Sequence, residues 1–433
     1  MAQAESVLTR LGRPGVLFAL ALAVRLAYLA WQGTDPTAAF HPDTPMFLAI
    51  AVSPEWWMGT AERLPGYPIF LALHFFVFGP EAHWAPLVTQ AAVDAGACVA
   101  IARTAQTLHP SAGVWAGLFA AFNPTQIVMA GVLLGDSIFV ACLAFGFLAL
   151  ARWWRREGGA VAVGIWFGLA LFNRAVLWPF VPVLCLAMLA AGWRRDARSA
   201  PVVVLAIVGL FAAPIVARNS IEHGHAALSS QGPMHMALWW YPLVREAHDG
   251  TPYARSADAV TAQFRAAGGG QGGFADAEVY RAIVRERLAT LPPRAYVQAW
   301  TMGAGINLAS PATLMIPRVM ALPRTGFYAT EGQSPLEKAQ AFLMRSSSAP
   351  YLAWLAGGVA LEWPVRALSV FGLLVLWRPR PTRAAALFAL AWIGFILAVQ
   401  GPVASAKYRL PIEPIAMALA GVALARGREV WRP

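Results

Sequence analysis

The stretch "FNPTQIVMAGVLLGDSIFVACLAFGFLALARWW", residues 122–154, contains an apolar run at 131–151 that is followed by arginines. About 20 apolar residues are enough for one helix to cross the hydrocarbon core of a bilayer. In lipid the backbone must satisfy its own hydrogen bonds, which a helix does within the segment. The run therefore predicts a membrane-spanning helix, with Asp136 close to one end.

Other parts of the chain repeat this pattern. The 433 residues are 58% hydrophobic and only 13% charged, whereas soluble domains are typically about 25% charged. These values predict an all-α polytopic membrane protein with about 10 transmembrane helices. The expected spans lie near 14–32, 83–103, 111–129, 131–151, 160–173, 175–192, 200–217, 350–377, 383–402 and 409–425.

The distribution of arginine predicts the orientation of these spans. The net charge is +11, and loops that stay in the cytoplasm carry an excess of Lys and Arg. With a cytoplasmic N-terminus, the arginine clusters at 10–13, 152–156, 194–198, 378–383 and 426–432 all lie inside. We interpret the excess of basic residues as loop charge that sets the orientation of the spans, and we expect no nucleic-acid partner.

Two long segments then lie outside the membrane. Residues 1–217 are predicted to form a transmembrane core with a first outer loop at 33–82, whose apolar stretch 65–79 is expected to lie at the interface. Residues 218–349 form a mixed periplasmic region, and 350–433 supply the C-terminal spans. Within the outer region, 294–316 either lies on the membrane or spans it, and the sequence leaves both alternatives open.

Two charges fall inside predicted spans. Arg25 lies in the first span and Asp94 in the second. A charge at the bilayer centre costs roughly 3 kcal/mol on insertion scales, so such residues are usually paired or functional. A structural ion pair between adjacent antiparallel helices is the favoured interpretation, and a proton or substrate path is the alternative.

Polar clusters gather on the outer side of the predicted membrane. They are "HPDT" (41–44), "ERLPGYP" (62–68), Asp136, "ARNSIEHGHAALSSQG" (217–232) and "KYRLP" (407–411). Taken singly, each has a structural explanation: a turn, a span end, a snorkelling cation, or a carboxylate at a helix start. Together they combine carboxylates suited to proton abstraction with cations suited to a lipid phosphate. The pattern favours chemistry on a lipid-phosphate substrate.

Several of these segments resemble the GT-C glycosyltransferases, above all bacterial aminoarabinose transferases and protein O-mannosyltransferases. The resemblance rests on the "PD" after the first span, on "RLPGYPIFLAL", and on three later segments. These are "NPTQIVMAGVLLGDSIFVA", "GIWFGLALFNRAVLWP" and "KYRLPIEPIAMALAG", with "APIVARNSIEHG" at the end of the seventh span. It covers most of 14–232 and 405–425. It implies a polyprenyl-phosphate-linked sugar donor and inversion at the anomeric carbon.

Roles for individual residues follow from the resemblance. Asp43 matches the first-loop acid, a general base or an acceptor-orienting carboxylate, and Asp136 matches the second acid. Donor phosphate is expected at four cations: Arg63, Arg218, Lys407 and Arg409. Further substrate contacts are expected at His41, Tyr67, Asn219, His225 and Tyr408, although lone histidines are more often structural.

The resemblance also has a point of departure. Thr44 follows Asp43 where many relatives have a second acid, and no metal-binding spacing occurs, so we expect no metal or other cofactor. The expected partners are the donor, membrane lipids, and a lipid, glycan or protein acceptor. A bacterial inner membrane with a periplasmic site is the expected location. A multi-pass transporter or lipid flippase is the alternative function.

Overall fold

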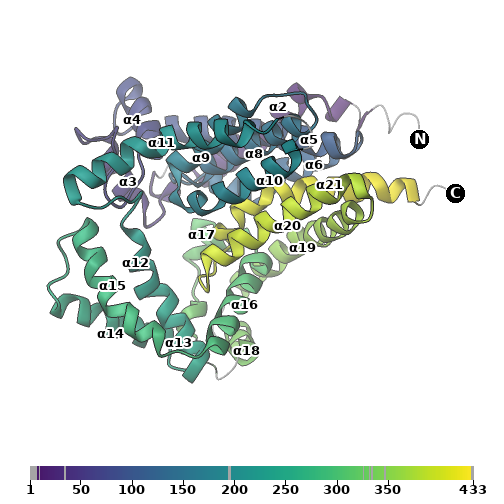
Figure 1. Cartoon of the computed structure of the whole chain (residues 1–433). Coiled ribbons are helices and arrows are strands. Elements are labelled where there is room, and N and C mark those ends of the chain that lie inside the picture. The colour runs from purple at the N-terminus through teal and green to yellow at the C-terminus, as the bar shows by residue number, and fades with distance from the viewer. Residues whose placement is uncertain are drawn as a thin grey trace.

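The computed structural model describes residues 7–8, 10–33, 36–193, 197–324, 326–330, 332, 335–345 and 348–430. Within these residues the chain is 80% helical and has no strand. The long helices form one bundle, and the segments near both chain ends lie at the same end of it (Figure 1). The predicted all-α polytopic fold is confirmed.

Seven helical segments in the described ranges are long and apolar enough to cross a membrane. They are α2 (Pro14–Gln32), α5 (Trp84–Leu108), α8 (Asp136–Trp154), α11 (Ala200–His223), α19 (Ala349–Trp377), α20 (Arg380–Gln400) and the segment Ala406–Arg426. The last segment combines a 3-10 helix, η6 (Ala406–Ile412), with the start of α21 (Glu413–Val430).

Shorter apolar helices occupy the remaining predicted positions. They are α4 (Gly66–Phe78), α6 (Ala112–Ala121), α9 (Ala160–Asn173) and the pair η2 (Ala175–Phe180) and α10 (Val181–Trp193). The short helix α7 (Pro124–Ala130) follows α6, and Asn123 caps it by accepting hydrogen bonds from the backbone N–H groups of Thr125 and Gln126. The predicted third span is therefore broken in two at Asn123, because Pro124 lacks the N–H that would continue the first helix.

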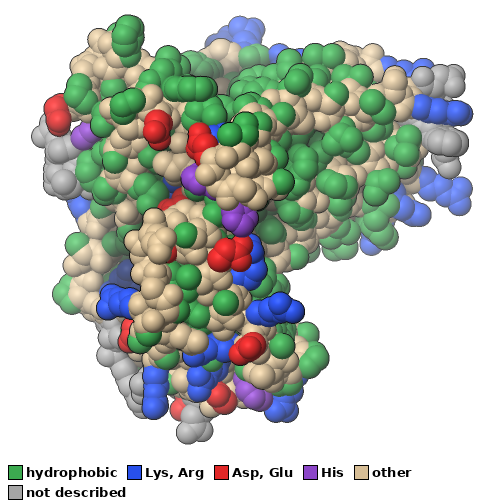
Figure 2. Space-filling view, turned by 60° about the vertical axis from the view of Figure 1, so that its left-hand side comes forward, with side chains coloured by type: hydrophobic (Ala, Val, Ile, Leu, Met, Phe, Trp, Pro, Cys, Tyr) green, Lys and Arg blue, Asp and Glu red, His purple; other side chains and the backbone are tan. Residues whose placement is uncertain are grey.

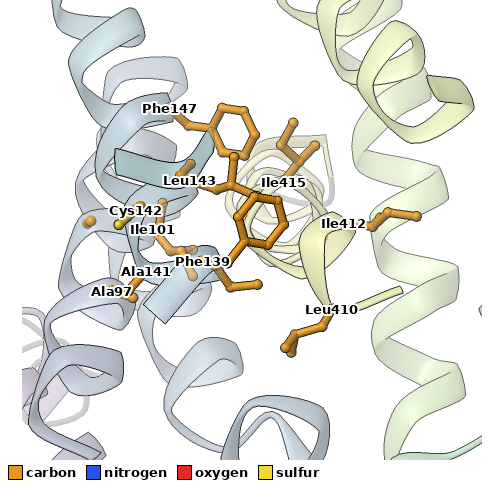
Figure 3. Packing of buried hydrophobic residues seen from close by; sticks show 14 of the residues in the cluster. Ala97, Ile101, Phe139, Ala141, Cys142, Leu143, Phe147, Leu410, Ile412 and Ile415 are labelled. Carbon is orange, nitrogen blue, oxygen red and sulfur yellow. The ribbon is translucent and has the colours of Figure 1, made fainter. Parts of the chain in front are cut away.

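The centre of the bundle is the last helix, α21, which packs against α5, α6, α8 and α19. In Figure 3, Ile101 of α5, Phe139 and Leu143 of α8, and Ile415 of α21 converge on one buried cluster. Small residues allow close backbone approach between membrane helices. At Gly372 of α19 an added Cβ would lie only 1.9 Å from the carbonyl oxygen of Leu419, so only glycine fits there.

The ion pair expected in the first two spans is present. Arg25 Nε donates to Oδ2 of Asp94 at 2.5 Å, and Arg25 is only 1% exposed. The guanidinium also donates to the carbonyl oxygen of Ala121 at 2.8 Å, and Gln126 donates to Asp94 at 3.1 Å. The pair therefore joins α2 and α5 to the end of α6 and to α7.

Breaking this pair tests its structural role. We expect Arg25→Ala and Asp94→Ala each to lower the free energy of unfolding by about 3 kcal/mol, because each leaves an unpaired buried charge. The double variant should lose clearly less than the sum of the two. Unfolding in mixed detergent micelles measures all three variants, and strictly additive losses would refute the coupling.

The outer parts of the chain lie at the other end of the bundle (Figure 1). The first loop supplies α3 (Thr44–Ala51) and α4, and the later outer region runs through helices α12–α18. These are α12 (Gln231–His235), the π-helix η3 (Met236–Trp240), α13 (Tyr241–Asp249), α14 (Tyr253–Ala266), α15 (Gly273–Ala289), α16 (Pro293–Ala309), α17 (Pro317–Met320) and α18 (Pro335–Arg345). The outer region has a hydrophobic cluster of its own, built around Val260, Phe264 and Tyr280.

Two details of the outer parts bear on the sequence predictions. Helix α11 continues to His223, six residues past the predicted boundary at 217. Residues 294–316 do not form one helix, because α16 ends at Ala309 and a separate 3-10 helix, η4 (Ala312–Met315), follows. Helix α16 packs against α13 of the outer region and against η6 and α20 of the bundle, so it connects the two parts.

Candidate functional site

Asp43 lies where the first loop returns to the bundle. Pro42 and Asp43 form the turn before α3, and Thr44 fixes this turn by donating to the carbonyl oxygen of Leu133 at 2.9 Å. The side chain of Asp43 is 32% exposed, so it stays accessible to solvent. Figure 2 shows that acidic, basic and histidine side chains mix on this side of the molecule, whereas hydrophobic side chains cover the bundle beside them.

Three basic groups surround the carboxylate of Asp43. Arg63 Nη2 donates to Oδ1 at 2.9 Å, Lys407 Nζ lies 3.9 Å from Oδ2, and His41 Nδ1 lies 3.4 Å from Oδ2. His41 Nε2 is also 3.3 Å from Nζ of Lys407. The hydrogen bond with His41, reinforced by the Arg63 and Lys407 cations, holds the pKa of Asp43 well below its usual range. Asp43 is therefore ionised at every physiological pH.

Asp136 forms a second acid–base pair. It is the first residue of α8, where the helix dipole favours a carboxylate, and it pairs with Arg174, which lies between α9 and η2. The Asp136 side chain is buried, whereas that of Arg174 is partly exposed. Tyr67 lies within electrostatic reach of Asp136 and donates its hydroxyl to Gln90 at 2.6 Å. Gln90 in turn donates to the carbonyl oxygen of Val132 at 2.9 Å, so the two side chains support the turn before α8.

Lys407 connects the two pairs. It lies within electrostatic reach of Asp136 and Arg174 as well as of Asp43 and Arg63, and the neighbouring Tyr408 faces the same four charges. Three cations therefore face two carboxylates, which leaves one net positive charge when the nearby histidines are neutral. A site of this charge fits a phosphate monoester or diester, for which Arg and Lys are the usual ligands.

Arg218 and Asn219 hold the first loop in place. Arg218 donates to the carbonyl oxygens of Met58 at 2.6 Å and Thr60 at 2.8 Å, and also to the Asn219 side chain. Asn219 donates to the carbonyl oxygen of Ala227 at 2.7 Å. The structure thus gives Arg218 a role in positioning the Arg63 loop, which differs from the phosphate contact predicted for it.

His225 lies away from the charged cluster. Its ring stacks on Phe274 of α15, with ring centres 4.6 Å apart, and Nδ1 is 4.0 Å from Glu278. In the described residues these contacts connect His225 to the outer region. His225, for which a substrate contact was predicted, is therefore not a member of the cluster that joins Asp43 to Lys407.

Arg409 is also placed differently from its prediction. Its side chain is fully buried and pairs with Glu362 of α19 and with Glu413, at 2.9 Å from Oε1 of the latter. It also donates to the hydroxyl of Thr125 at 2.9 Å. Arg366 pairs with Glu413 from the other side. The side chain therefore anchors η6 to α19 and α7, a structural role that differs from the phosphate contact predicted for Arg409.

Sequence reasoning missed two members of the charged site. Arg174 is the arginine of "GLALFNRAVLWP", so the motif that carried the resemblance already contained it. His235 lies within electrostatic reach of Asp43, Arg63, Arg174 and Lys407, but nothing in its local sequence marks it. In the described part of the chain, no three His, Cys, Asp or Glu side chains are placed to hold a metal ion.

Comparison with known proteins rests on structure alone. No family model matches the chain, and no curated protein matches it. The Archaeoglobus fulgidus oligosaccharyltransferase tethered to an acceptor peptide with the NVT sequon matches with a TM-score of 0.54 at 13% identity. Archaeal oligosaccharyltransferase AglB from the same organism, in complex with an inhibitory peptide and a dolichol-phosphate, matches with a TM-score of 0.53 at 14% identity. The chain shares its fold with this oligosaccharyltransferase.

The matches cover nearly all of this chain but only part of the proteins it matches. Each match covers 96% of this chain but only 50% of the oligosaccharyltransferase, so the chain spans half the length of that protein. ArnT from Cupriavidus metallidurans in the apo state also matches, at 15% identity over 95% of this chain and 76% of ArnT, with a TM-score of 0.37. At these identities the fold alone is what the chain shares with the oligosaccharyltransferase.

Proposed function

We propose that this protein is an integral membrane glycosyltransferase that transfers a sugar from a polyprenyl-phosphate donor to an acceptor on the outer face. The observation that carries the proposal is the cluster of Arg63, Arg174 and Lys407 around Asp43 and Asp136. Fixed cations at this position would stabilise the negative charge that develops on a departing lipid phosphate. The shared fold adds support, because AglB of that fold was solved with a dolichol-phosphate.

The proposed reaction is a single displacement with inversion. The acceptor hydroxyl oxygen forms a bond to the anomeric carbon, and the bond from that carbon to the phosphate oxygen breaks with its electron pair remaining on the phosphate. Of the two roles that the resemblance gives Asp43, the ion pairing favours orientation of the acceptor hydroxyl. A carboxylate held by Arg63 and Lys407 accepts a hydrogen bond well but is a weak base, because its pKa is low.

The transporter or flippase alternative has less support from the buried charges. A transport path needs ionisable groups that face a passage through the bundle. The charges inside the spans are instead paired with one another: Arg25 with Asp94, and Arg409 with Glu413. We also propose a bacterial inner membrane location with the site facing the periplasm, and an acceptor that is a lipid, a glycan or a protein.

The function is tested with purified protein in lipid nanodiscs. A panel of polyprenyl-phosphate-linked hexoses, pentoses and amino sugars is added with a lipid extract as acceptor, and release of polyprenyl phosphate is measured. We expect release with at least one donor, and about tenfold weaker binding of polyprenyl phosphate by Lys407→Ala, since one charge-assisted contact of about 1.5 kcal/mol is lost.

The matched control is Lys338→Ala, the only other lysine of the chain, which pairs with Glu246 in the outer region. This variant should keep the affinity of wild type for the lipid phosphate. Equal loss of affinity in both variants would indicate a general effect of lost stability and would contradict the proposed site. Uptake or flipping of a lipid without any transfer would favour the transporter.

A further inference from the structure

The guanidinium of Arg63 is held by one short stretch of the chain, residues 43–47. Nη2 donates to Oδ1 of Asp43 at 2.9 Å, Nε donates to the sulfur of Met46 at 3.1 Å, and the guanidinium carbon lies 5.2 Å from the centre of the Phe47 ring. The Arg63 side chain is only 16% exposed. The position of this site cation therefore depends on the sulfur of Met46 as well as on the carboxylate of Asp43.

The backbone of Arg63 is fixed independently of these contacts. Arg63 N donates to the Thr60 hydroxyl at 3.0 Å, and the carbonyl oxygen of Arg63 accepts from Thr60 N at 2.9 Å. At Gly59 the backbone has a φ of +70°, and an added Cβ would lie 2.4 Å from the carbonyl oxygen of Arg63, so this turn is tight. A chemical change at Met46 therefore acts on the guanidinium rather than on the turn that carries it.

Met46 is accessible from outside although its sulfur contacts the site. It is the third residue of α3 and is 39% exposed. In the described part of the chain, two other methionines are exposed, Met320 of α17 and Met344 of α18, and neither has its sulfur in a hydrogen bond. Of these three accessible thioethers, Met46 is the one that contacts a cation of the charged site.

The thioether of Met46 is a weak partner for Nε of Arg63. A methionine sulfur accepts hydrogen bonds poorly, so a phosphate oxygen can replace it with a large gain for the guanidinium. Oxidation converts the side chain into a polar sulfoxide, whose oxygen is a much better acceptor. Because methionine has three rotatable bonds, this oxygen can turn toward Nε from its place beside Arg63. It then competes with a phosphate for the same N–H group.

We propose that Met46 is an oxidation site whose sulfoxide weakens binding of a lipid phosphate at Arg63. The proposal rests on the proposed function, because it takes Arg63 as a contact of the donor phosphate. A lone pair of the Met46 sulfur attacks one oxygen of hydrogen peroxide, and the S–O bond forms as the O–O bond breaks. The sulfur loses two electrons, and the other oxygen leaves as water after it takes up the proton of the transferred oxygen.

The change can be reversed, which makes it suited to regulation. Methionine sulfoxide is reduced back to the thioether by MsrA and MsrB, one enzyme for each of the two sulfoxide epimers. Reduction of Met46 returns Nε of Arg63 to its weak sulfur partner and frees it for a phosphate oxygen. The lipid-phosphate affinity of the site would therefore follow the balance between peroxide and reductase.

The inference is tested on the full chain in lipid nanodiscs treated with hydrogen peroxide. Peptide mass spectrometry follows sulfoxide at Met46, Met320 and Met344, and isothermal titration measures the affinity for undecaprenyl phosphate. We expect affinity to fall about tenfold when Met46 is fully oxidised, the effect of losing one charge-assisted hydrogen bond. Treatment of the oxidised protein with MsrA and MsrB together should restore the affinity.

Two variants assign the effect to Met46. Met46→Leu nearly conserves the side-chain volume but removes the sulfur, and Met344→Leu makes the same change at an exposed position of α18. Each protein is compared with itself before and after peroxide, so any effect of the substitution itself cancels. Met46→Leu should keep its affinity after treatment, whereas Met344→Leu should lose affinity like wild type. Met46→Gln, which supplies a neutral carbonyl acceptor, should bind like the oxidised wild type without treatment.

The possible outcomes separate this inference from the proposed function. If Met46 is oxidised and the affinity does not change, or if Met46→Leu loses as much affinity as wild type, the inference is wrong while the proposed function stands. The same conclusion follows if Met46 stays reduced while Met320 and Met344 are oxidised. If untreated wild type does not bind undecaprenyl phosphate at all, both are overturned.

Discussion

Asp43→Asn should lower the rate of transfer by about 1000-fold while binding of polyprenyl phosphate stays as tight as in wild type or becomes tighter. The substitution keeps the shape of the side chain but removes one of the two negative charges that face Arg63, Arg174 and Lys407. The site then has two net positive charges in place of one. A ground state that contains a phosphate anion gains from this change, whereas the transition state loses the carboxylate that orients the acceptor.

The opposite responses of affinity and rate make this prediction specific. Binding of polyprenyl phosphate is measured by tryptophan fluorescence, and transfer by release of polyprenyl phosphate in single turnovers. Glu81→Gln serves as the control, because it makes the same acid-to-amide change at an exposed position of the first loop. Asp43→Asn with wild-type transfer would remove Asp43 from the mechanism, and a parallel loss of both properties would indicate that the loop has collapsed.

Glu413→Gln should lower the free energy of unfolding by about 3–5 kcal/mol, the cost of leaving buried charges without their partner. Glu413 is fully buried and accepts hydrogen bonds from Arg366, Arg409 and Asn123, the last at 2.8 Å. With the amide in place, only Glu362 remains to balance the two arginines. The network would then carry a net positive charge although most of its side chains are buried.

This loss should also be visible in the site. Glu413 and Arg409 fix η6, and Lys407 and Tyr408 belong to the same 3-10 helix. Glu413→Gln should therefore weaken binding of polyprenyl phosphate although it touches no part of the site. Glu157→Gln breaks an exposed pair with Arg155 and should cost less than about 1 kcal/mol. Equal stability of Glu413→Gln and wild type would contradict the anchoring role.

The sequence predicted the membrane architecture because that information is local. The length of an apolar run and the arginines at its ends are properties of neighbouring residues, so the spans could be recognised one by one. The predicted span at 111–129 ran through Asn123 and Pro124, although an Asn-Pro pair is itself a turn signal in the sequence, and the structure starts α7 there.

The site was predicted only in part, because its members are brought together by packing. Motifs pointed to Asp43, Arg63, Asp136 and Lys407. The structure pairs Asp43 with Arg63 and brings Lys407 near it, whereas Asp136 pairs with Arg174. Lys407 and Arg409 both belong to η6, but Lys407 lies near Asp43 whereas Arg409 pairs with Glu362. A spacing of two residues in a 3-10 helix does not reveal which side chain points to which partner. Ser230 and Ser229 of the later outer region bind the first loop through hydrogen bonds to the carbonyl oxygens of Ala61 and Glu62, for which no sequence signal exists.

The origin of the site cations along the chain has a consequence for biosynthesis. Arg63 enters the membrane early, whereas Lys407 belongs to the last span. At about 5–20 residues per second, the ribosome needs roughly 20 to 70 s to proceed from one to the other. In the folded chain Arg63 has Asp43 as its counter-ion, and both residues are synthesised early. The site therefore gains its excess positive charge only when synthesis of the last helix places Lys407 near this pair.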